Sequence, residues 1–274
     1  MKFTIEKLKK LINESEAIVI GAGAGLSAAA GFEYGGEFFK KHFPEMYELG
    51  YRDMYYAGFH HFESEESKWA YWSKYIYYCR CQGAKQLYKD LLDIVKNKNY
   101  FVLTTNVDHQ FQLAGFDKDR LFYTQGDFGL FQCSLPCHNK TYDNKETILK
   151  MFKEQKNNLI PSTLVPKCPV CGEIMDTNLR ADDRFVQDDG WYKSNQKYNE
   201  FIEKNKNKKI LFLELGVGFN TPVIIKYPFM KMTYQFDDAF YVCINKGQNF
   251  VPNEIKGKSL LIDDDISKVI ELLK

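Results

Sequence analysis

A glycine-rich segment directly after a short apolar run constrains the fold of this chain more than any other feature. Ile18, Val19 and Ile20 are followed by GAGAGLSAAAG, which spans residues 21–31. An apolar, β-branched run is typical of a buried parallel strand. The glycines that follow allow the backbone to approach an anion, and the amides at a helix start favour negative charge. The segment predicts a phosphate-binding turn; a small-residue helix packed tightly on a sheet is the alternative.

Apolar runs and helix-like segments continue to alternate along the chain. Helices are expected at residues 3–14, 84–98, 108–113, 192–206 and 266–273, and residues 222–233 have a mixed pattern. Strands are expected at residues 17–20, 100–104, 121–124, 210–215, 240–244 and 259–262. Short, almost wholly apolar strands between helices predict an α/β fold with a doubly wound, Rossmann-like parallel sheet.

Two segments interrupt this alternation. Residues 33–82 are rich in aromatic side chains at loosely helical spacing, and residues 128–189 carry closely paired cysteines. We expect 33–82 to be a helical insertion whose aromatic residues form a small core, although an aromatic wall facing a substrate is an alternative. Residues 1–127 and 190–274 are then expected to form the nucleotide-binding domain, and residues 128–189 a small zinc-binding module.

A second glycine-rich loop follows a later apolar run. The segment LGVGFNTP at residues 215–222 places Gly216, Gly218 and Asn220 directly after the expected strand. Two such loops at the carboxyl ends of two parallel strands are able to bracket one dinucleotide. No acidic residue stands out about 20 residues after the first loop, the spacing typical of dehydrogenases. The pattern therefore favours dinucleotide binding without favouring hydride transfer.

Polar side chains follow two other apolar runs. Asn106 and Asp108 lie in TTNVD at residues 104–108, and Gln125 lies in TQGD at residues 124–127. Open α/β sheets bind ligands at the carboxyl ends of their strands, so these side chains are expected to face one crevice. Asn106 and Asp108 suit ribose hydroxyls and a carboxamide. A helix cap without a further role is the alternative, because Asn and Asp are favoured there.

The cysteines predict a metal site. Cys133 and Cys137 form one close pair, and Cys168 and Cys171 form the other, in a segment with the turn residues of a zinc knuckle. Four thiolates in two pairs suit a structural, tetrahedral Zn²⁺, and such a closed site leaves no position for catalysis. His138 in place of Cys137 is the alternative ligand. The other cysteines of the chain are expected to be packing residues.

Composition excludes several classes of protein. The chain has 37 Lys+Arg and 36 Asp+Glu among its 274 residues, a balance that provides no field to attract nucleic acid. No apolar run reaches the roughly 20 residues that span a bilayer. The odd number of cysteines, seven, fits metal ligation in a reducing compartment better than a disulfide framework. We therefore expect a cytoplasmic protein that binds neither nucleic acid nor membranes.

The order of these motifs resembles the sirtuin family of NAD-dependent enzymes over nearly the whole chain. The family's opening Gly-Ala-Gly-x-Ser motif matches residues 23–27, its Thr-Gln-Asn-Ile-Asp motif is similar to residues 104–108, and its zinc ribbon lies at the same place. The segment at 244–246 resembles the family's adenosine-side asparagine segment. The resemblance implies NAD as co-substrate, held by Gly23, Ala24, Gly25, Ser27, Asn106, Val107, Asp108, Gln125, Gly216, Gly218, Asn220, Asn245 and Lys246.

Two departures from the family pattern bear on activity. Sirtuins carry His-Gly at the catalytic strand, whereas this chain has Gln125 and Gly126, and their Pro-Asp-Phe-Arg segment is replaced by EYGG at residues 33–36. In the family's deacetylation, the histidine accepts a ribose proton. A glutamine amide has no site that takes up a proton near neutral pH. It orients a ribose by hydrogen bonding, and nicotinamide departure needs only positioning and carboxamide contacts.

This combination resembles the macrodomain-linked microbial sirtuins, in which glutamine replaces the catalytic histidine. The resemblance implies protein mono-ADP-ribosylation with Asn106 and Gln125 as the catalytic pair. It also implies a lipoylated, glycine-cleavage-H-like carrier as acceptor and a macrodomain hydrolase as partner. The alternatives are a lysine deacylase in which Asp127 or water supplies the base, an NAD hydrolase, and a non-catalytic sensor of NAD or ADP-ribose.

Overall fold

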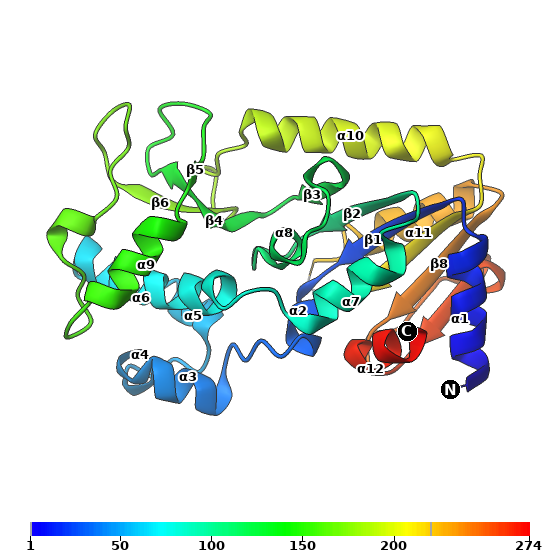
Figure 1. Ribbon diagram of the computed structural model, residues 1–274, viewed down its shortest axis with the longest axis horizontal. Helices are drawn as coiled ribbons and strands as arrows, with labels where there is room; N and C mark the ends of the chain where they lie inside the picture. Colours follow the sequence, from blue (N-terminus) through cyan, green and yellow to red (C-terminus); the bar gives the residue numbers. More distant parts are fainter. Residues whose placement is uncertain (1, 220) are drawn as a thin grey trace. The chain divides into compact units, whose positions relative to one another are not determined.

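The computed structural model describes residues 2–219 and 221–274 (Figure 1). The described residues form two compact units, each built from segments that are far apart in the sequence. Unit 1 contains the chain up to Ala30, together with Ala84–Gln125 and Asp189–Lys274. Unit 2 contains Gly31–Gly83 and Gly126–Asp188.

Unit 1 is built on a parallel sheet. In the described residues the sheet has six strands, in the order β3-β2-β1-β7-β8-β9, and every neighbouring pair is parallel. The strands are β1 (Ala17–Ala22), β2 (Tyr100–Thr104), β3 (Leu121–Tyr123), β7 (Ile210–Leu215), β8 (Ala239–Ile244) and β9 (Ser259–Ile262). The chain adds β2 and then β3 on one side of β1, and it then crosses to the other side of β1 for β7, β8 and β9, which is doubly wound topology. The predicted fold class is confirmed.

Helices cover both faces of this sheet (Figure 1). They are α1 (Lys2–Glu14), α2 (Ala24–Ala29), α7 (Gln86–Val95), α8 (Gln110–Ala114), α10 (Asp189–Asn205), α11 (Lys226–Gln235) and α12 (Ile266–Leu273), with 3₁₀ turns at Lys118–Arg120 and Asn253–Lys258. Within the described part of the chain, no helix combines the length and apolar character needed to cross a membrane.

Alternate side chains of each strand enter two separate cores. On one face, Ile20 and Val102 pack with Leu8, Leu91 and Val269 from α1, α7 and α12. Such side chains each contribute about 1.5–3 kcal/mol when fully buried. Because both faces are covered, the strands must be apolar throughout, which explains the continuous apolar runs in the sequence.

The opposite face packs against α10 and α11. Here Val19 and Phe212 of the strands contact Ile202 of α10 and Phe229 of α11.

α8 ends at Gly115, whose φ of 92° is in the left-handed region that a side chain disfavours. The helix predicted at 108–113 therefore ends where its glycine indicates.

Unit 2 combines helices with a small antiparallel sheet of order β5-β4-β6. The strands are β4 (Gly126–Cys133), β5 (Tyr142–Asp143) and β6 (Met175–Leu179). The helices are α3 (Gly36–His42), α4 (Pro44–Glu48), α5 (Met54–Ala57), α6 (Glu65–Ile76) and α9 (Lys145–Glu154), with a π-helical turn at Tyr77–Cys81 and a 3₁₀ turn at Ser162–Leu164.

The domain division differs from the expected one. The aromatic-rich segment 33–82 belongs with the cysteine-bearing segment in unit 2, instead of being an insertion in the nucleotide-binding unit. Its aromatic side chains pack on β4: the rings of Trp69 and Phe131 lie 5.1 Å apart, and those of Tyr75 and Phe128 lie 4.9 Å apart. The segment supplies the core that this short sheet needs, since three small strands bury little by themselves.

Candidate functional site

The loops that carry most of the predicted site residues begin at the carboxyl ends of neighbouring strands of the unit 1 sheet. Ala22, the last residue of β1, is in register with Thr104 at the end of β2 and with Leu215 at the end of β7. The first glycine-rich loop, the TTNVD loop and the second glycine-rich loop therefore leave three adjacent strands together. This is the carboxyl edge, where doubly wound sheets place their ligands.

The two glycine-rich loops are in direct backbone contact. The Gly25 amide donates a hydrogen bond of 2.9 Å to the Gly216 carbonyl. A Cβ on Gly25 would lie 2.7 Å from Gly216 Cα, and Gly216 itself has a φ of +65°. Any larger residue at either position would separate the loops, so the glycines are required by this approach. Gly218 is half-buried in the second loop, and Asn220 lies outside the described residues.

Asn106 ties the TTNVD loop to the first glycine-rich loop. Its side-chain amide donates to the Gly23 carbonyl at 2.9 Å, and its backbone amide donates to Thr104 Oγ1 at 3.0 Å. Thr104 Oγ1 in turn donates to the Ala22 carbonyl at 3.1 Å. Asn106 and Val107 are half-buried. The structure thus holds Asn106 at the carboxyl edge with its side chain partly open to a ligand.

Asp108 is the centre of a buried hydrogen-bond cluster. Its Oδ2 accepts hydrogen bonds from the Ser27 hydroxyl at 2.6 Å and from the Tyr88 hydroxyl at 2.9 Å. Its Oδ1 accepts from the Gln110 amide at 3.0 Å, the geometry of a turn that precedes α8. Asp108 is only 2% exposed. In this structure it fixes the loop that carries Asn106 rather than facing solvent.

Ser27 lies where the first glycine-rich loop meets the Asp108 cluster. It lies inside α2, whose N-cap is Gly23, so it does not begin the helix. Its single hydroxyl proton is donated to Asp108. A hydroxyl offers one proton, so in this conformation Ser27 presents only its lone pairs to other groups. Its contribution is to join the first glycine-rich loop to Asp108.

Tyr88 is the residue of the Asp108 cluster that the sequence motifs did not predict. It is fully buried on α7, and burial followed by the nearby Asp108 carboxylate raises its pKa well above 10.0, so its hydroxyl stays protonated. Leu91 and Val95 follow it at spacings of three and seven on the apolar face of the helix. A tyrosine on such a face needs a hydrogen-bond partner for its hydroxyl. This need is the sequence signal that could have pointed to Tyr88.

Gln125 follows β3 at the same edge of the sheet. The preceding Thr124 is fixed by its backbone amide, which donates to the Thr104 carbonyl at 2.9 Å. The Trp191 indole N–H donates to the Thr124 carbonyl at 3.2 Å. Gln125 is half-buried, and its side chain makes no hydrogen bond to another residue that the structure describes. A fixed backbone thus carries a side-chain amide that is available to a ligand.

Asn245 connects the end of β8 to the second glycine-rich loop. Its side-chain amide donates to the Val217 carbonyl at 3.0 Å, and its backbone amide donates to the Ile262 carbonyl of β9 at 3.1 Å. Lys246 follows on the surface and is exposed. The predicted adenosine-side segment therefore borders the second loop, as two loops bracketing one dinucleotide require.

The predicted cysteine ligands come together in unit 2. Among the residues that the structure describes, Cys133, Cys137, Cys168 and Cys171 place their sulfurs within 4.8 Å of one another. The Cys133–Cys171 and Cys137–Cys168 sulfur distances are 3.6 and 3.7 Å. Tetrahedral zinc with Zn–S bonds of about 2.3 Å sets its sulfurs about 3.8 Å apart. The donor set therefore fits a structural Zn²⁺.

The thiols of this cluster differ in acidity. Burial acts to raise the pKa of Cys168, but the backbone amides of Cys171 and Val170 outweigh it and lower that pKa to about 7. Desolvation, and then the neighbouring Cys171 and Cys168 thiols, raise the pKa of Cys137 to about 12. The Cys137 sulfur is part of the cluster, and His138 Nδ1 lies 2.9 Å from it. Four thiolates this close require a cation to be ionised together.

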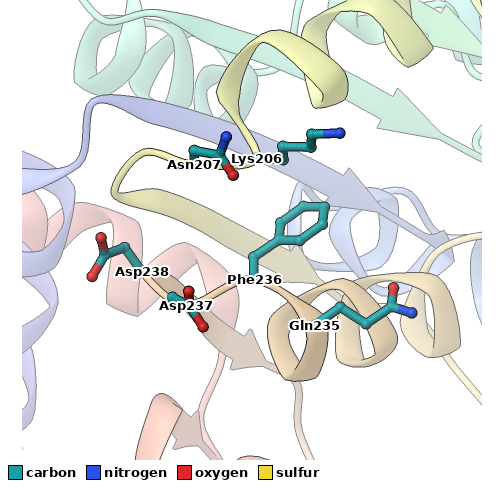
Figure 2. A pocket seen from close by; sticks show the side chains of 6 residues that line it. All are labelled: Lys206, Asn207, Gln235, Phe236, Asp237 and Asp238. Atoms are coloured by element: carbon teal, nitrogen blue, oxygen red, sulfur yellow. The ribbon is translucent and has the colours of Figure 1, made fainter.

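A surface hollow of about 530 Å³ lies at the other edge of the unit 1 sheet (Figure 2). It is lined by residues before β7 and β8: Lys206, Asn207, Gln235, Phe236, Asp237 and Asp238. These residues are at the amino ends of the strands, whereas doubly wound sheets bind ligands at the carboxyl ends. The hollow also brings together two carboxylates, which do not suit a phosphate. We therefore place the functional site at the glycine-rich loops.

Two curated proteins resemble the chain along almost its whole length. A protein ADP-ribosyltransferase of Staphylococcus aureus strain Mu50 is 39% identical over 269 residues, which are 97% of this chain and 85% of that protein. A probable bifunctional ADP-ribose hydrolase/ADP-ribosyltransferase of Fusarium oxysporum f. sp. cubense is 28% identical over 280 residues. That match covers 97% of this chain, which spans about half of the fungal protein, 47% of its length. No family model matches the chain.

Solved sirtuin structures share the fold. Sir2Tm bound to a propionylated peptide superposes with a TM-score of 0.62 at 19% identity, covering 97% of this chain and 95% of that one. A Sir2 complex with a p53 peptide and NAD⁺ gives a TM-score of 0.60 at 18% identity, with the same coverage. The similarities to solved structures show the fold of the chain. Its family follows from the sequence identity with the Staphylococcus aureus protein. The chain shares the fold of the sirtuins and belongs to the family of protein ADP-ribosyltransferases that the Staphylococcus aureus protein represents.

Proposed function

We propose that this enzyme transfers a single ADP-ribose from NAD to a protein acceptor, at the carboxyl edge of the unit 1 sheet. The observation that carries the proposal is the placement of Asn106, anchored on the Gly23 carbonyl after β2, and of Gln125 after the neighbouring strand β3. Both supply amides that orient ribose hydroxyls, and neither takes up a proton near neutral pH. Such a site supports nicotinamide departure better than it supports deacylation.

In the proposed reaction, the bond between nicotinamide and the anomeric carbon of ribose breaks. Its electron pair leaves with nicotinamide, and a lone pair of the acceptor forms the new bond to the same carbon. The acceptor's proton passes to solvent. Because positive charge develops on the ribose, oriented amide oxygens of Asn106 and Gln125 stabilise that state more than the ground state.

The remaining sequence-predicted residues are assigned to binding. The backbone of Gly23, Ala24 and Gly25 approaches the phosphates, with Gly216, Gly218 and Asn220 on the other side. Asn245 and Lys246 border the adenosine half, while Val107 and Asp108 support the nicotinamide half. The close contact of Gly25 with Gly216 favours this assignment, because one dinucleotide is able to touch both loops.

The metal and the partners complete the proposal. Zn²⁺ held by the four cysteines of unit 2 would neutralise their thiolates and cross-link that unit, a structural contribution only. A lipoylated carrier protein is the proposed acceptor, and a macrodomain hydrolase that removes ADP-ribose is the proposed partner. The name of the fungal relative, which combines a hydrolase with a transferase in a longer chain, supports such a pairing.

A mass balance on NAD tests the function. The purified protein is incubated with NAD alone, with an acetyl-lysine peptide, and with a lipoylated carrier protein, and nicotinamide, ADP-ribose, acyl-ADP-ribose and intact protein masses are followed. We expect an ADP-ribose adduct on the carrier and an unchanged peptide. Deacetylated peptide with acyl-ADP-ribose would instead show a deacylase, and free ADP-ribose without an adduct would show an NAD hydrolase.

Variants assign the reaction to the site. Asn106→Ala and Gln125→Ala are each expected to abolish the adduct. Gln125→Ala should keep the urea midpoint, whereas Asn106→Ala should lower it slightly because the hydrogen bond to Gly23 is lost. Gln235→Ala is the matched control, since it removes an exposed glutamine at the opposite edge of the same sheet. An adduct that forms at the normal rate in both site variants would reject this assignment.

A further inference from the structure

We propose that Tyr88 is a positioning residue of the NAD site, which acts through Asp108 on the nicotinamide half of the dinucleotide. The proposal rests on the proposed function only in taking NAD as the ligand. Tyr88 lies on α7 and does not belong to any of the motifs that predicted the site. Its hydroxyl nevertheless lies at the point where the first glycine-rich loop and the TTNVD loop meet.

The geometry of the cluster carries the inference. The hydroxyls of Tyr88 and Ser27 both donate to one oxygen of Asp108, at 2.9 and 2.6 Å, and they lie 3.4 Å from each other. The Asn106 amide is close enough to the Tyr88 hydroxyl to act on its pKa. The buried hydroxyl of Tyr88 therefore contacts Ser27 of the first glycine-rich segment and Asp108, the carboxylate that fixes the TTNVD loop.

Burial raises the cost of losing any one of these hydrogen bonds. Ser27, Tyr88 and Asp108 are each at most 2% exposed, so water does not replace a donor that is lost. The loop from Thr105 to Asp108 has few alternatives, because His109 directly after it adopts a φ of 62° in the left-handed region. Removal of the Tyr88 hydroxyl is thus expected to displace the Asp108 carboxylate and with it Asn106.

The contacts that hold the two glycine-rich loops to each other and to the end of β8 do not pass through Tyr88. Gly25 meets Gly216 through backbone atoms, and Asn245 reaches Val217 through its own side chain. The phosphates and the adenosine half of the ligand are therefore expected to bind without help from Tyr88. ADP-ribose contains these parts and lacks nicotinamide, so comparing it with NAD isolates the effect.

The test measures the Kd of NAD and of ADP-ribose by calorimetry for the full chain and for Tyr88→Phe. We expect the variant to bind NAD about tenfold more weakly, as for one hydrogen bond to a charged group, and ADP-ribose within about twofold of the wild type. Ser27→Ala removes the other donor to the same oxygen and is expected to give the same split. Equal weakening of both ligands, or of neither, in Tyr88→Phe would overturn the proposal.

Tyr241→Phe is the matched control. Tyr241 is also a fully buried tyrosine of unit 1 that donates to a buried carboxylate, that of Glu214, but it lies inside β8. Both variants are expected to lower the urea midpoint by similar amounts, while only Tyr88→Phe changes the ratio of the two Kd values. A change of this ratio in Tyr241→Phe would show general loosening of the unit. Absence of NAD binding by the wild type would count against the proposed function instead.

Discussion

Asp108 and Glu214 are two carboxylates of unit 1 that are at most 2% exposed, and their surroundings differ. Asp108 accepts hydrogen bonds from two hydroxyls and a backbone amide at the carboxyl edge of the sheet. Glu214 lies inside β7, where Lys226 Nζ donates to it at 2.5 Å with both side chains completely buried. Neutral donors hold the first carboxylate, and an ion pair holds the second.

The two kinds of partner suit the different places of the two carboxylates, one at a loop and the other inside a strand. Hydroxyls and amides have fixed geometries and leave the charge of Asp108 at the ligand edge, so they define the position of a loop. Lys226 instead neutralises a charge that has no route to water, and Tyr241 and Cys243 occupy the remaining sides of Glu214. Burial, and then Glu214, raise the pKa of Cys243 to about 12, which keeps this thiol protonated. The first arrangement suits a site and the second suits a core.

The cysteine cluster of unit 2 adds a third way to hold negative charge, and its loss should have the largest effect. Metal removal by a chelator leaves sulfurs within 4.8 Å of one another without a cation. Zinc binding contributes about 10–16 kcal/mol in small zinc domains. We expect β4 and β6 to lose protection in hydrogen exchange while the unit 1 sheet keeps it.

A matched pair of cysteine variants checks this expectation. Cys168→Ser should lose the metal and the protection of unit 2, whereas Cys81→Ser, outside the cluster but in the same unit, should keep both. Elemental analysis of the wild type should give about one zinc per chain. A ratio near zero would contradict the assignment of these cysteines.

Lys226→Met is expected to have the largest effect within unit 1. The variant leaves Glu214 buried without its cation, and breaking a buried pair in this way costs about 3–5 kcal/mol. Adding Glu214→Gln should recover much of the loss, because the charge that lacked a partner is gone. Urea unfolding of the single and the double variant measures both steps. A double variant as unstable as Lys226→Met would show that packing, not charge, dominates there.

Asp108→Asn should cost less stability, about 1–3 kcal/mol, because neutral donors adapt. Ser27 and Tyr88 are hydroxyls that also accept hydrogen bonds, so they are able to reorient toward an amide. Nicotinamide release from NAD should nevertheless fall, since the loop that carries Asn106 moves. If Asp108→Asn proved as destabilising as Lys226→Met, the distinction between the two carboxylates would not hold.

The sequence predicted the fold of unit 1 well because its signals are local. Each strand is an apolar run, and α12 has the predicted bounds, residues 266–273. The grouping of residues 33–82 with the cysteine segment was not predictable in this way. It depends on ring contacts such as that of Trp69 with Phe131, which are 62 positions apart, and no periodicity encodes such a pairing.

The site shows the same division. Asn106, Asp108, Gln125 and the glycines of the proposed site were predicted because motifs at strand ends single them out, and the cysteines were predicted because of their spacing. Tyr88 was missed because its hydroxyl is on an apolar helix face that periodicity assigns to the core. Glu214, an isolated charge in an apolar strand, signalled a buried partner, but nothing local identified Lys226 as that partner.

The smallest expected effect concerns Asp90, a carboxylate of unit 1 that is 9% exposed and whose partner lies at the surface. A hydrogen bond from Lys274 Nζ, at 2.7 Å, lowers the pKa of Asp90 below its ordinary value of 3.8. A lowered folded-state pKa stabilises the protein above the unfolded-state value, and this contribution is lost as the pH falls through the folded-state pKa. Asp90→Asn should therefore reduce stability slightly near neutral pH, and the difference between the two proteins should shrink as the pH falls through the folded-state pKa of Asp90. Because the Lys274 side chain is 48% accessible, water competes for this pair, and the change should be smaller than for Asp108 or Glu214. Urea midpoints of the two proteins across this range would measure it, and a difference as large as that of Asp108→Asn would mean that burial does not set the order of these effects.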